Sequence, residues 1–152
     1  MGRYEDVPES VKMVVRNVKE QWFTELANAR IKVLFDLKKK MGGGKMVLGR
    51  IQKTNDLLRH LTVDEADSDE GYDYIMYLDK MVFNNIEDED KIRLVRHELR
   101  HCFLDLDARG TPYKLVGHDV EDFEEEIRLN GEEIGWARRC AEIGLSLYEQ
   151  QE

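Results

Sequence analysis

The sequence of 152 residues predicts one domain of the α+β class. Apolar residues recur at spacings of three and four over residues 8–28 and again over 88–103, which is typical of amphipathic helices. Between them, residues 31–37 largely alternate between apolar and polar, and residues 72–78 are rich in strand formers. No repeat and no linker interrupts the chain, so we expect a single core over residues 1–152.

The expected sheet is small, with three strands that are mainly antiparallel. Residues 31–37 and 46–51 flank the triplet Gly42-Gly43-Gly44 and predict a hairpin with a glycine turn. Residues 72–78 supply the third strand. We expect this sheet to pack on the first helix and on the central one.

The helix boundaries follow from turn and cap residues. Pro8 fits the first turn of the first helix, and Asp88 is a candidate N-cap for the central helix. The apolar stripe of the central helix includes Leu99, Cys102 and Leu106. Around these two helices the pattern predicts a short helical turn at 57–61, an acidic loop at 64–70, a short strand at 113–116, a helix that closes at Asn130-Gly131 and a last helix over 133–149.

Composition limits where the protein acts. Charged residues make up 36% of the chain, and no apolar run approaches the roughly 18 residues of a membrane span. The N-terminal residues are acidic and lack the apolar core of a secretory signal, so we expect a cytoplasmic protein without a membrane partner. The two cysteines, Cys102 and Cys140, fit small buried side chains in predicted helices better than a disulfide framework.

Charge is unevenly spread along the chain. The net charge is -9, but residues 1–60 carry 13 Lys and Arg against 7 Asp and Glu, and residues 61–152 carry 10 against 25. Such asymmetry leaves open a basic face for an acidic partner. The overall acidity argues against general binding of nucleic acid.

The segment His97-Glu98-Leu99-Arg100-His101 carries the chemistry. Helix positions four apart differ by about 40° in direction and about 6 Å in rise, so the two imidazoles can reach one metal ion. Zinc with three protein ligands keeps an open position and lowers the pKa of its bound water to about 7. Glu98, about 100° around the helix from His97, can take a proton from that water. The spacing predicts metal-assisted hydrolysis at one zinc ion, with His97 and His101 as ligands and Glu98 as general base.

A third ligand has to come from elsewhere in the chain. His118 is the leading candidate, because it follows a glycine and a loop that can return over the motif. A glutamate or aspartate on the next helix is the other common solution. The alternatives are Glu121, Asp122, Glu124 and Glu125. A carboxylate that does not bind the metal can accept the Nδ1 proton of a ligating histidine or cap its own helix.

The two segments together resemble a known family. His97-Glu98-Leu99-Arg100-His101, followed by Gly117-His118-Asp119-Val120-Glu121-Asp122-Phe123, is similar to the metallopeptidase family of phages and prophages. More distantly, the chain resembles SprT-like zinc proteases. The resemblance implies a zincin-like fold, in which a small sheet lies over the motif helix and zinc binds between that helix and a downstream segment. It also implies His97, His101 and His118 as zinc ligands and Glu98 as the base.

The expected function is hydrolysis of peptide bonds in a peptide or protein substrate. One alternative is a non-catalytic, zinc-stabilised module that binds another protein, since a small domain can use a metal for folding alone. The other alternative comes from the SprT likeness. It is a protease that acts on proteins bound to DNA, with the basic N-terminal half as the contact.

Overall fold

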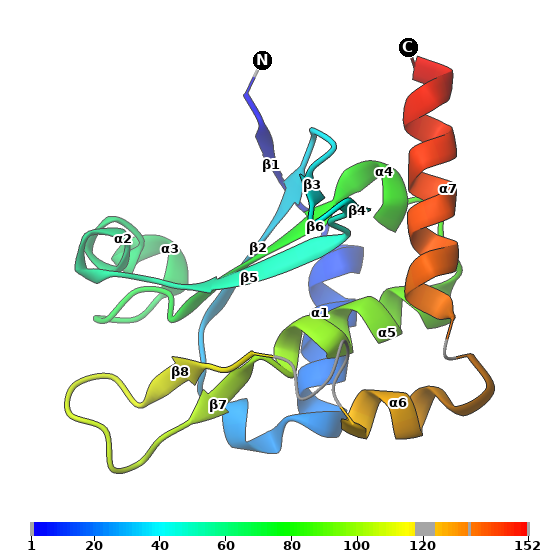
Figure 1. The fold of residues 1–152 in the computed structure, drawn as a ribbon. Coiled ribbons are helices and arrows are strands. Elements are labelled where there is room, and N and C mark those ends of the chain that lie inside the picture. Colours follow the sequence, from blue (N-terminus) through cyan, green and yellow to red (C-terminus); the bar gives the residue numbers. More distant parts are fainter. Residues whose placement is uncertain (1, 118–123, 134, 152) are drawn as a thin grey trace.

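The computed structural model describes residues 2–117, 124–133 and 135–151 and has the α+β class expected from the sequence. Its main sheet has four strands in the order β1-β2-β6-β5, instead of the expected three. The additional strand is β1 (Tyr4–Asp6), which pairs antiparallel with β2 (Ile31–Asp36). Helices α1 and α5 lie together on one face of this sheet (Figure 1).

The centre of the sheet is a parallel pair, so the sheet is mixed, although two of its three strand pairings are antiparallel. β2 runs parallel to β6 (Tyr74–Asp79), with Val33 opposite Met76 and Phe35 opposite Leu78. β5 (Gly49–Lys53) pairs antiparallel with the other side of β6 and forms an edge. Every residue of β6 is buried, as expected for a central strand that is covered on both faces.

The predicted hairpin forms, but between different strands. Gly43 and Gly44 adopt positive φ angles of 57° and 78° in the turn between β3 (Met41–Gly42) and β4 (Lys45–Met46). The strand over 31–37 does not pair with the strand after the glycines, because β6 lies between them. A second two-stranded sheet joins β7 (Cys102–Leu104) to β8 (Tyr113–Leu115), which confirms the strand predicted at 113–116.

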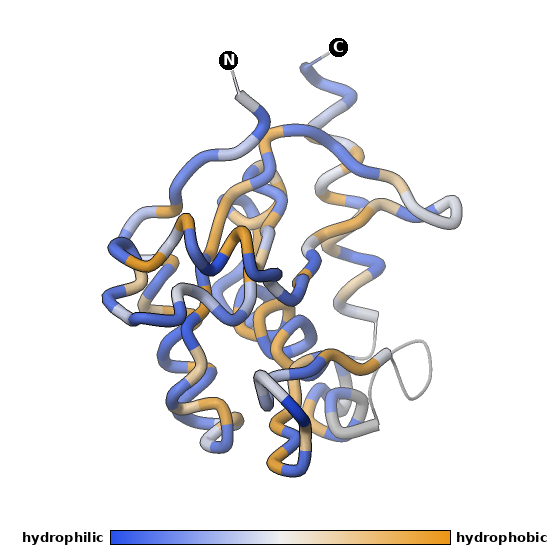
Figure 2. Tube along the Cα trace, turned by 90° about the vertical axis from the view of Figure 1, so that its left-hand side faces the viewer, coloured by the Kyte–Doolittle hydropathy of each residue, from blue (hydrophilic) through white to orange (hydrophobic). Residues whose placement is uncertain are grey.

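Helix α1 (Glu9–Trp22) begins after Pro8, as expected, and ends earlier than residue 28. Its valines Val11, Val15 and Val18 are buried against the sheet and against α5. A short 3-10 helix, η1 (Thr24–Leu26), follows and buries Leu26. Figure 2 shows hydrophobic stretches that alternate with hydrophilic ones along the elements and meet toward the middle of the molecule.

Helix α5 (Asp88–Leu99) is the central motif helix, with Glu87 and not Asp88 at its N-cap. The helix was expected to continue to Phe103, but it ends at Leu99 with Arg100 as C-cap. Cys102 therefore lies in strand β7, where it is buried, and Leu106 is 83% exposed in the loop that follows. The predicted apolar stripe of the helix therefore ends at Leu99. Leu99 and Val95 are both fully buried.

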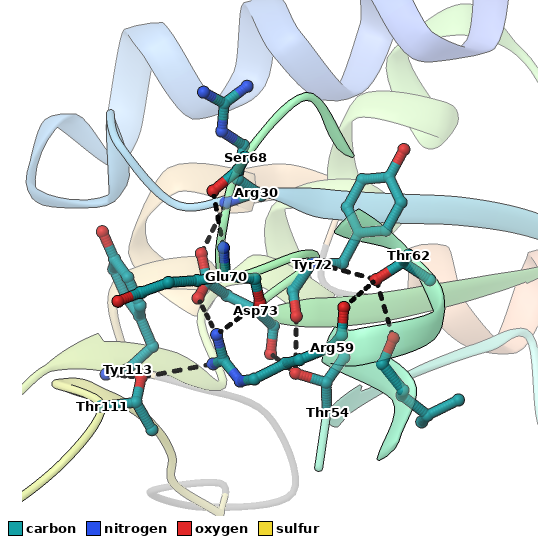
Figure 3. Close-up of polar contacts among 11 residues, drawn as sticks. Arg30, Thr54, Arg59, Thr62, Ser68, Glu70, Tyr72, Asp73, Thr111 and Tyr113 are labelled. Carbon is teal, nitrogen blue, oxygen red and sulfur yellow. Dashed lines mark hydrogen bonds and ion pairs between the residues drawn. The ribbon is translucent and has the colours of Figure 1, made fainter. Parts of the chain in front are cut away.

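Two short helices, α2 (Asp56–Leu61) and α3 (Val63–Ala66), occupy the weakly patterned region, and Asn55 caps α2 by accepting from the Leu58 N–H at 2.9 Å. Arg59 of α2 pairs with Asp73 at 3.0 Å and donates to Thr111 Oγ1 at 3.3 Å (Figure 3). Because Asp73 precedes β6 and Thr111 precedes β8, this arginine joins the end of the main sheet to the β7–β8 hairpin.

The remaining elements are α4 (Lys80–Phe83), α6 (Glu124–Asn130), η2 (Gly131–Glu133) and α7 (Trp136–Gln151). Helix α7 packs on α4 and β4 at Gly144, where an added Cβ would come within 2.5 Å of Val82 and 2.9 Å of Met46. This last helix begins at Trp136, three residues later than predicted. Cys140 is buried in it, as expected. No helix among the described residues is long and apolar enough to span a membrane.

Candidate metal centre

The three motif side chains lie at the C-terminal end of α5. His97 and Glu98 belong to its last turn, and His101 follows the C-cap residue. The backbone N–H of His101 donates to the Glu98 carbonyl at 3.2 Å. This hydrogen bond is of the 3-10 type and extends the helical turn to His101. His101 thus stays about one turn from His97 although the helix has formally ended.

The two imidazoles face a common space. Their ring centroids are 5.6 Å apart and their planes are inclined at 78°. Two imidazoles bound to one tetrahedral zinc have ring centres roughly 5 Å apart, so the observed separation is compatible with both rings on one ion. His97 also packs edge-on against the buried Trp136 of α7, at 6.3 Å between ring centroids, which limits the rotation of its ring.

The tautomer of His101 follows from its backbone contact. His101 Nδ1 lies 2.7 Å from the carbonyl oxygen of Val116, which can only accept a hydrogen bond. Nδ1 therefore carries the proton, and Nε2 of the neutral ring keeps its lone pair. A histidine that donates one ring N–H to a carbonyl and turns the other nitrogen toward a metal is the usual arrangement in zinc sites.

Glu98 is almost fully buried, with 5% of the residue exposed. Burial raises the pKa of its carboxyl to about 7, and the nearby His97 lowers the pKa by a smaller amount. Gly49 of β5 lies directly against it, since an added Cβ would be 3.6 Å from Glu98 Cγ and 3.0 Å from the Tyr77 carbonyl. A carboxyl group with a pKa near neutrality is matched to accepting and returning a proton.

The motif residues line a cleft of about 1450 Å³ that is open to solvent. Its walls are the edge strand β5, the β3–β4 hairpin, the end of β8 and the first turns of α7. His97, Glu98 and His101 form part of the lining together with Gly49, Ile51, Val116, Trp136 and Ala137. The fourth histidine, His60, is exposed on α2 and does not belong to the lining.

The candidates for the third ligand, His118, Glu121 and Asp122, lie outside the described residues, and so do the side chains of Glu124 and Glu125. Within the described ranges no group of three His, Cys, Asp or Glu side chains could hold a metal ion. The described residues fit zinc at two positions, because they offer two neighbouring imidazoles in one cleft, and the Nδ1 contact of His101 leaves its Nε2 available as a ligand atom.

Sequence reasoning missed a set of charged residues behind the site. Arg96 and Arg100 of the motif helix pair with Glu126 of α6, whose carboxylate is fully buried. The signal in the sequence is a pair of arginines four apart, each of which directly follows an apolar residue of the helix. Such a pattern indicates a buried charge partner, but it does not say which of the many acidic residues downstream supplies it.

Comparison with known proteins gives one finding. A family model described as "Putative phage metallopeptidase" matches residues 2–143, which includes both the motif helix and the segment after it. No match was found among curated proteins, and none among solved structures.

Proposed function

The chain belongs to this phage metallopeptidase family, and from that membership together with the geometry of the cleft we propose that it is a zinc-dependent peptidase. His97 and His101 would hold the ion, with His118 as third ligand and Asp122 or Glu121 as the alternatives. The zincin-like arrangement that the resemblance implies is part of the proposal. The observation that carries it is the joint placement of two neighbouring imidazoles and a buried carboxyl group in one open cleft.

The chain's own residues have distinct parts in this proposal. Zinc, when bound, supplies a Lewis acid that polarises a carbonyl and acidifies water. Glu98 accepts the proton of the attacking water and returns it to the leaving amine. Val116 fixes the ring of His101 through its carbonyl, and Trp136 packs against the ring of His97.

The edge strand β5 supports a peptide as the substrate. It pairs with β6 on one side, and its residues Gly49, Arg50 and Ile51 line the cleft on the other. An extended peptide can add to a free strand edge through main-chain hydrogen bonds. A peptide placed there would run past Glu98, because Gly49 is in contact with that side chain.

The test is replacement of Glu98 by Gln. The zinc-loaded wild type is incubated with a peptide library from a bacterial proteome, and new chain ends are identified by mass spectrometry. Because the base acts only in the chemical step, Glu98→Gln should retain zinc and lose cleavage by about 10²-fold or more. Glu142→Gln is the matched control, since Glu142 also lines the cleft but is exposed, and it should cleave at close to the wild-type rate.

Two outcomes would overturn the proposal. The first is a wild-type protein that holds zinc and produces no new chain ends, which would favour a zinc-stabilised interaction module. The second is a Glu98→Gln variant that cleaves as fast as the wild type, which would remove Glu98 from the mechanism.

A further inference from the structure

Two lysines, Lys53 of β5 and Lys114 of β8, lie next to each other at one end of the cleft. Ile51 and Leu115 of the same two strands belong to the cleft lining. Strands β5 and β8 are in contact there, although they are not paired (Figure 1). Because alternate residues of a strand point to the same face, Lys53 shares a face of β5 with Gly49 and Ile51. The lysines therefore stand just beyond the lined part of the cleft.

Tyr74 of the central strand β6 holds the backbone of both lysines. It is fully buried, and its Cα is the register partner of the Lys53 Cα. Its hydroxyl donates to the carbonyl oxygen of Lys114 at 2.8 Å. One rigid, buried side chain thus fixes where the two lysines emerge, and their neighbourhood is a property of the fold.

The positive charge of this lysine pair is not neutralised by the protein. Both lysines are partly buried, and no carboxylate in the part of the chain that the structure describes forms an ion pair with either of them. Desolvation lowers the pKa of Lys53, and the charges of Lys114 and Arg59 lower it further. Arg59 itself is paired with Asp73 at 3.0 Å. Two neighbouring like charges raise the free energy of the unbound protein, and a bound anion would relieve this repulsion.

The position of the lysine pair along β5 indicates which anion it meets. Gly49 lies against the side chain of Glu98, and Lys53 is four residues further along the strand. At about 3.3 Å per residue this separation is about 13 Å. A peptide paired with the free edge of β5 covers the same distance with about four residues. The anion within reach of the lysines is therefore a carboxylate of the peptide itself.

We propose that Lys53 and Lys114 determine specificity by binding a carboxylate of the peptide substrate, about three to five residues from the bond that is cleaved. This inference rests on the proposed function, because it takes that bond to lie beside Glu98. The carboxylate belongs to an Asp or Glu side chain or to the C-terminus of the substrate, and the chemistry is the same in both cases. The net charge of the chain is -9, so an acidic peptide gains nothing from the overall field and depends on this local pair.

Binding is measured with the Glu98→Gln chain, so that the peptides stay intact. The probes are short rhodamine-labelled peptides, capped at both ends, with a single Glu, Gln or Lys placed at each position in turn. Fluorescence anisotropy should show that the best Glu peptide binds about 3- to 10-fold more tightly than its Gln counterpart, and that high salt reduces this ratio. A Gln peptide with a free C-terminus is the second arm. If it gains affinity over its capped counterpart, the chain end is the source of the carboxylate.

Charge variants of the lysine pair make this test specific. Lys53→Gln/Lys114→Gln should abolish the preference for a carboxylate and leave the affinity for the Gln peptide nearly unchanged. The matched control is Lys12→Gln/Arg16→Gln, which removes two positive charges from exposed positions of α1 and should keep the preference. Lys53→Glu/Lys114→Glu should reverse it, so that the Lys peptide binds best. A general loss of folding would not produce that reversal.

Cleavage sites provide the second measurement, which separates this inference from the proposed function. In the peptide library, Asp, Glu or a C-terminus should be enriched about three to five residues from the bonds that the wild type cleaves, and Lys53→Gln/Lys114→Gln should lose this enrichment. Cleavage without it, or with an enrichment that the variant keeps, would refute the carboxylate site and leave the peptidase standing. A wild type that cleaves nothing but shows the lysine-dependent preference in binding would refute the peptidase alone. If the Glu, Gln and Lys peptides bind equally, or none binds, the carboxylate site does not exist.

Discussion

At the scale of single residues, the cleft depends on contrasts between chemically similar side chains. Glu98 and Glu142 both line it, but Glu98 is almost fully buried and the Glu142 side chain is 66% exposed. The sequence indicates Glu98 as the base because of its place between two histidines. It does not show that Gly49 lies against the Glu98 side chain, because that contact depends on a strand some fifty positions earlier in the chain.

Gly71 is a residue that the fold specifies tightly, although no sequence motif marks it. Its φ is 69°, and an added Cβ would lie 2.2 Å from the Arg59 carbonyl oxygen and 2.7 Å from Thr62 Oγ1. We expect Gly71→Ala to lower the free energy of unfolding by more than about 2 kcal/mol, because backbone strain and steric overlap add. Chemical denaturation measures this loss.

The control is Gly43→Ala. Gly43 has a φ of 57°, but nothing lies within 4 Å of an added Cβ, so only the backbone strain of about 1 kcal/mol remains. Equal losses for the two variants would mean that the close packing between Gly71 and α2 does not exist in solution.

At the scale of elements, the motif helix is attached to its neighbours by buried charges. Asp90 accepts from Arg139 of α7 at 2.7 and 2.8 Å and from Arg93 at 2.6 Å. Burial raises the pKa of Asp90, but the hydrogen bonds from Arg139 and Arg93 outweigh it, and the pKa lies below its ordinary value. The ionised carboxylate therefore stabilises the folded state.

This shift gives stability a defined pH dependence. Since the pKa of Asp90 is lower in the folded than in the unfolded state, its contribution is complete above the ordinary carboxyl pKa of about 4 and is lost as the pH falls through the folded value. At pH 7, Asp90→Asn should cost about 1–3 kcal/mol, a moderate value because the Arg139 side chain is 41% exposed and can be hydrated.

The measurement is chemical denaturation of both proteins from pH 7 to pH 3. The difference in unfolding free energy between wild type and variant should shrink toward acid pH as the wild-type carboxyl group takes up its proton. A difference that is the same at both ends of this range would show that the ion pair does not stabilise the fold.

The elements also show what local patterns can predict. The start of α1 directly after Pro8, the strand β6 and the strand β8 follow from proline geometry, strand formers and a preceding turn, all of which act within a few residues. The end of α5 could not be predicted in this way. Cys102 continues the helical spacing, but it pairs instead with Leu115 across a hairpin, and the Tyr74 hydroxyl secures that hairpin by donating to the Lys114 carbonyl at 2.8 Å.

At the scale of the whole molecule, the order of the strands in the main sheet could not be predicted from the sequence. The glycine turn predicts that the strands on either side of it pair, whereas β6 separates β2 from β5 and runs parallel to β2. β1 is only three residues long, all of them exposed, and it shows no apolar alternation. Its own residues therefore do not predict a strand, which forms by pairing with β2. Pairings over long sequence separations depend on the assembled core, and the buried pairs of Glu126 depend on it in the same way.

The site was predictable to the extent that it is local. His97, Glu98 and His101 lie together because one helical turn joins them, and the structure brings them into one cleft. Val116, the partner of His101, directly follows strand β8, and the β7–β8 hairpin can form only because α5 ends at Leu99. The metal itself, its third ligand and the role of Glu98 stay predictions.

Zinc content is the measurement that tests the central claim most directly. The purified chain is loaded with zinc, passed over a desalting column and analysed for metal, together with a His97→Ala/His101→Ala double variant and a His60→Ala control, whose histidine is exposed outside the cleft. We expect one zinc ion per chain in the wild type and in His60→Ala, and none in the double variant. A folded wild type without zinc, or a double variant that keeps it, would contradict the account.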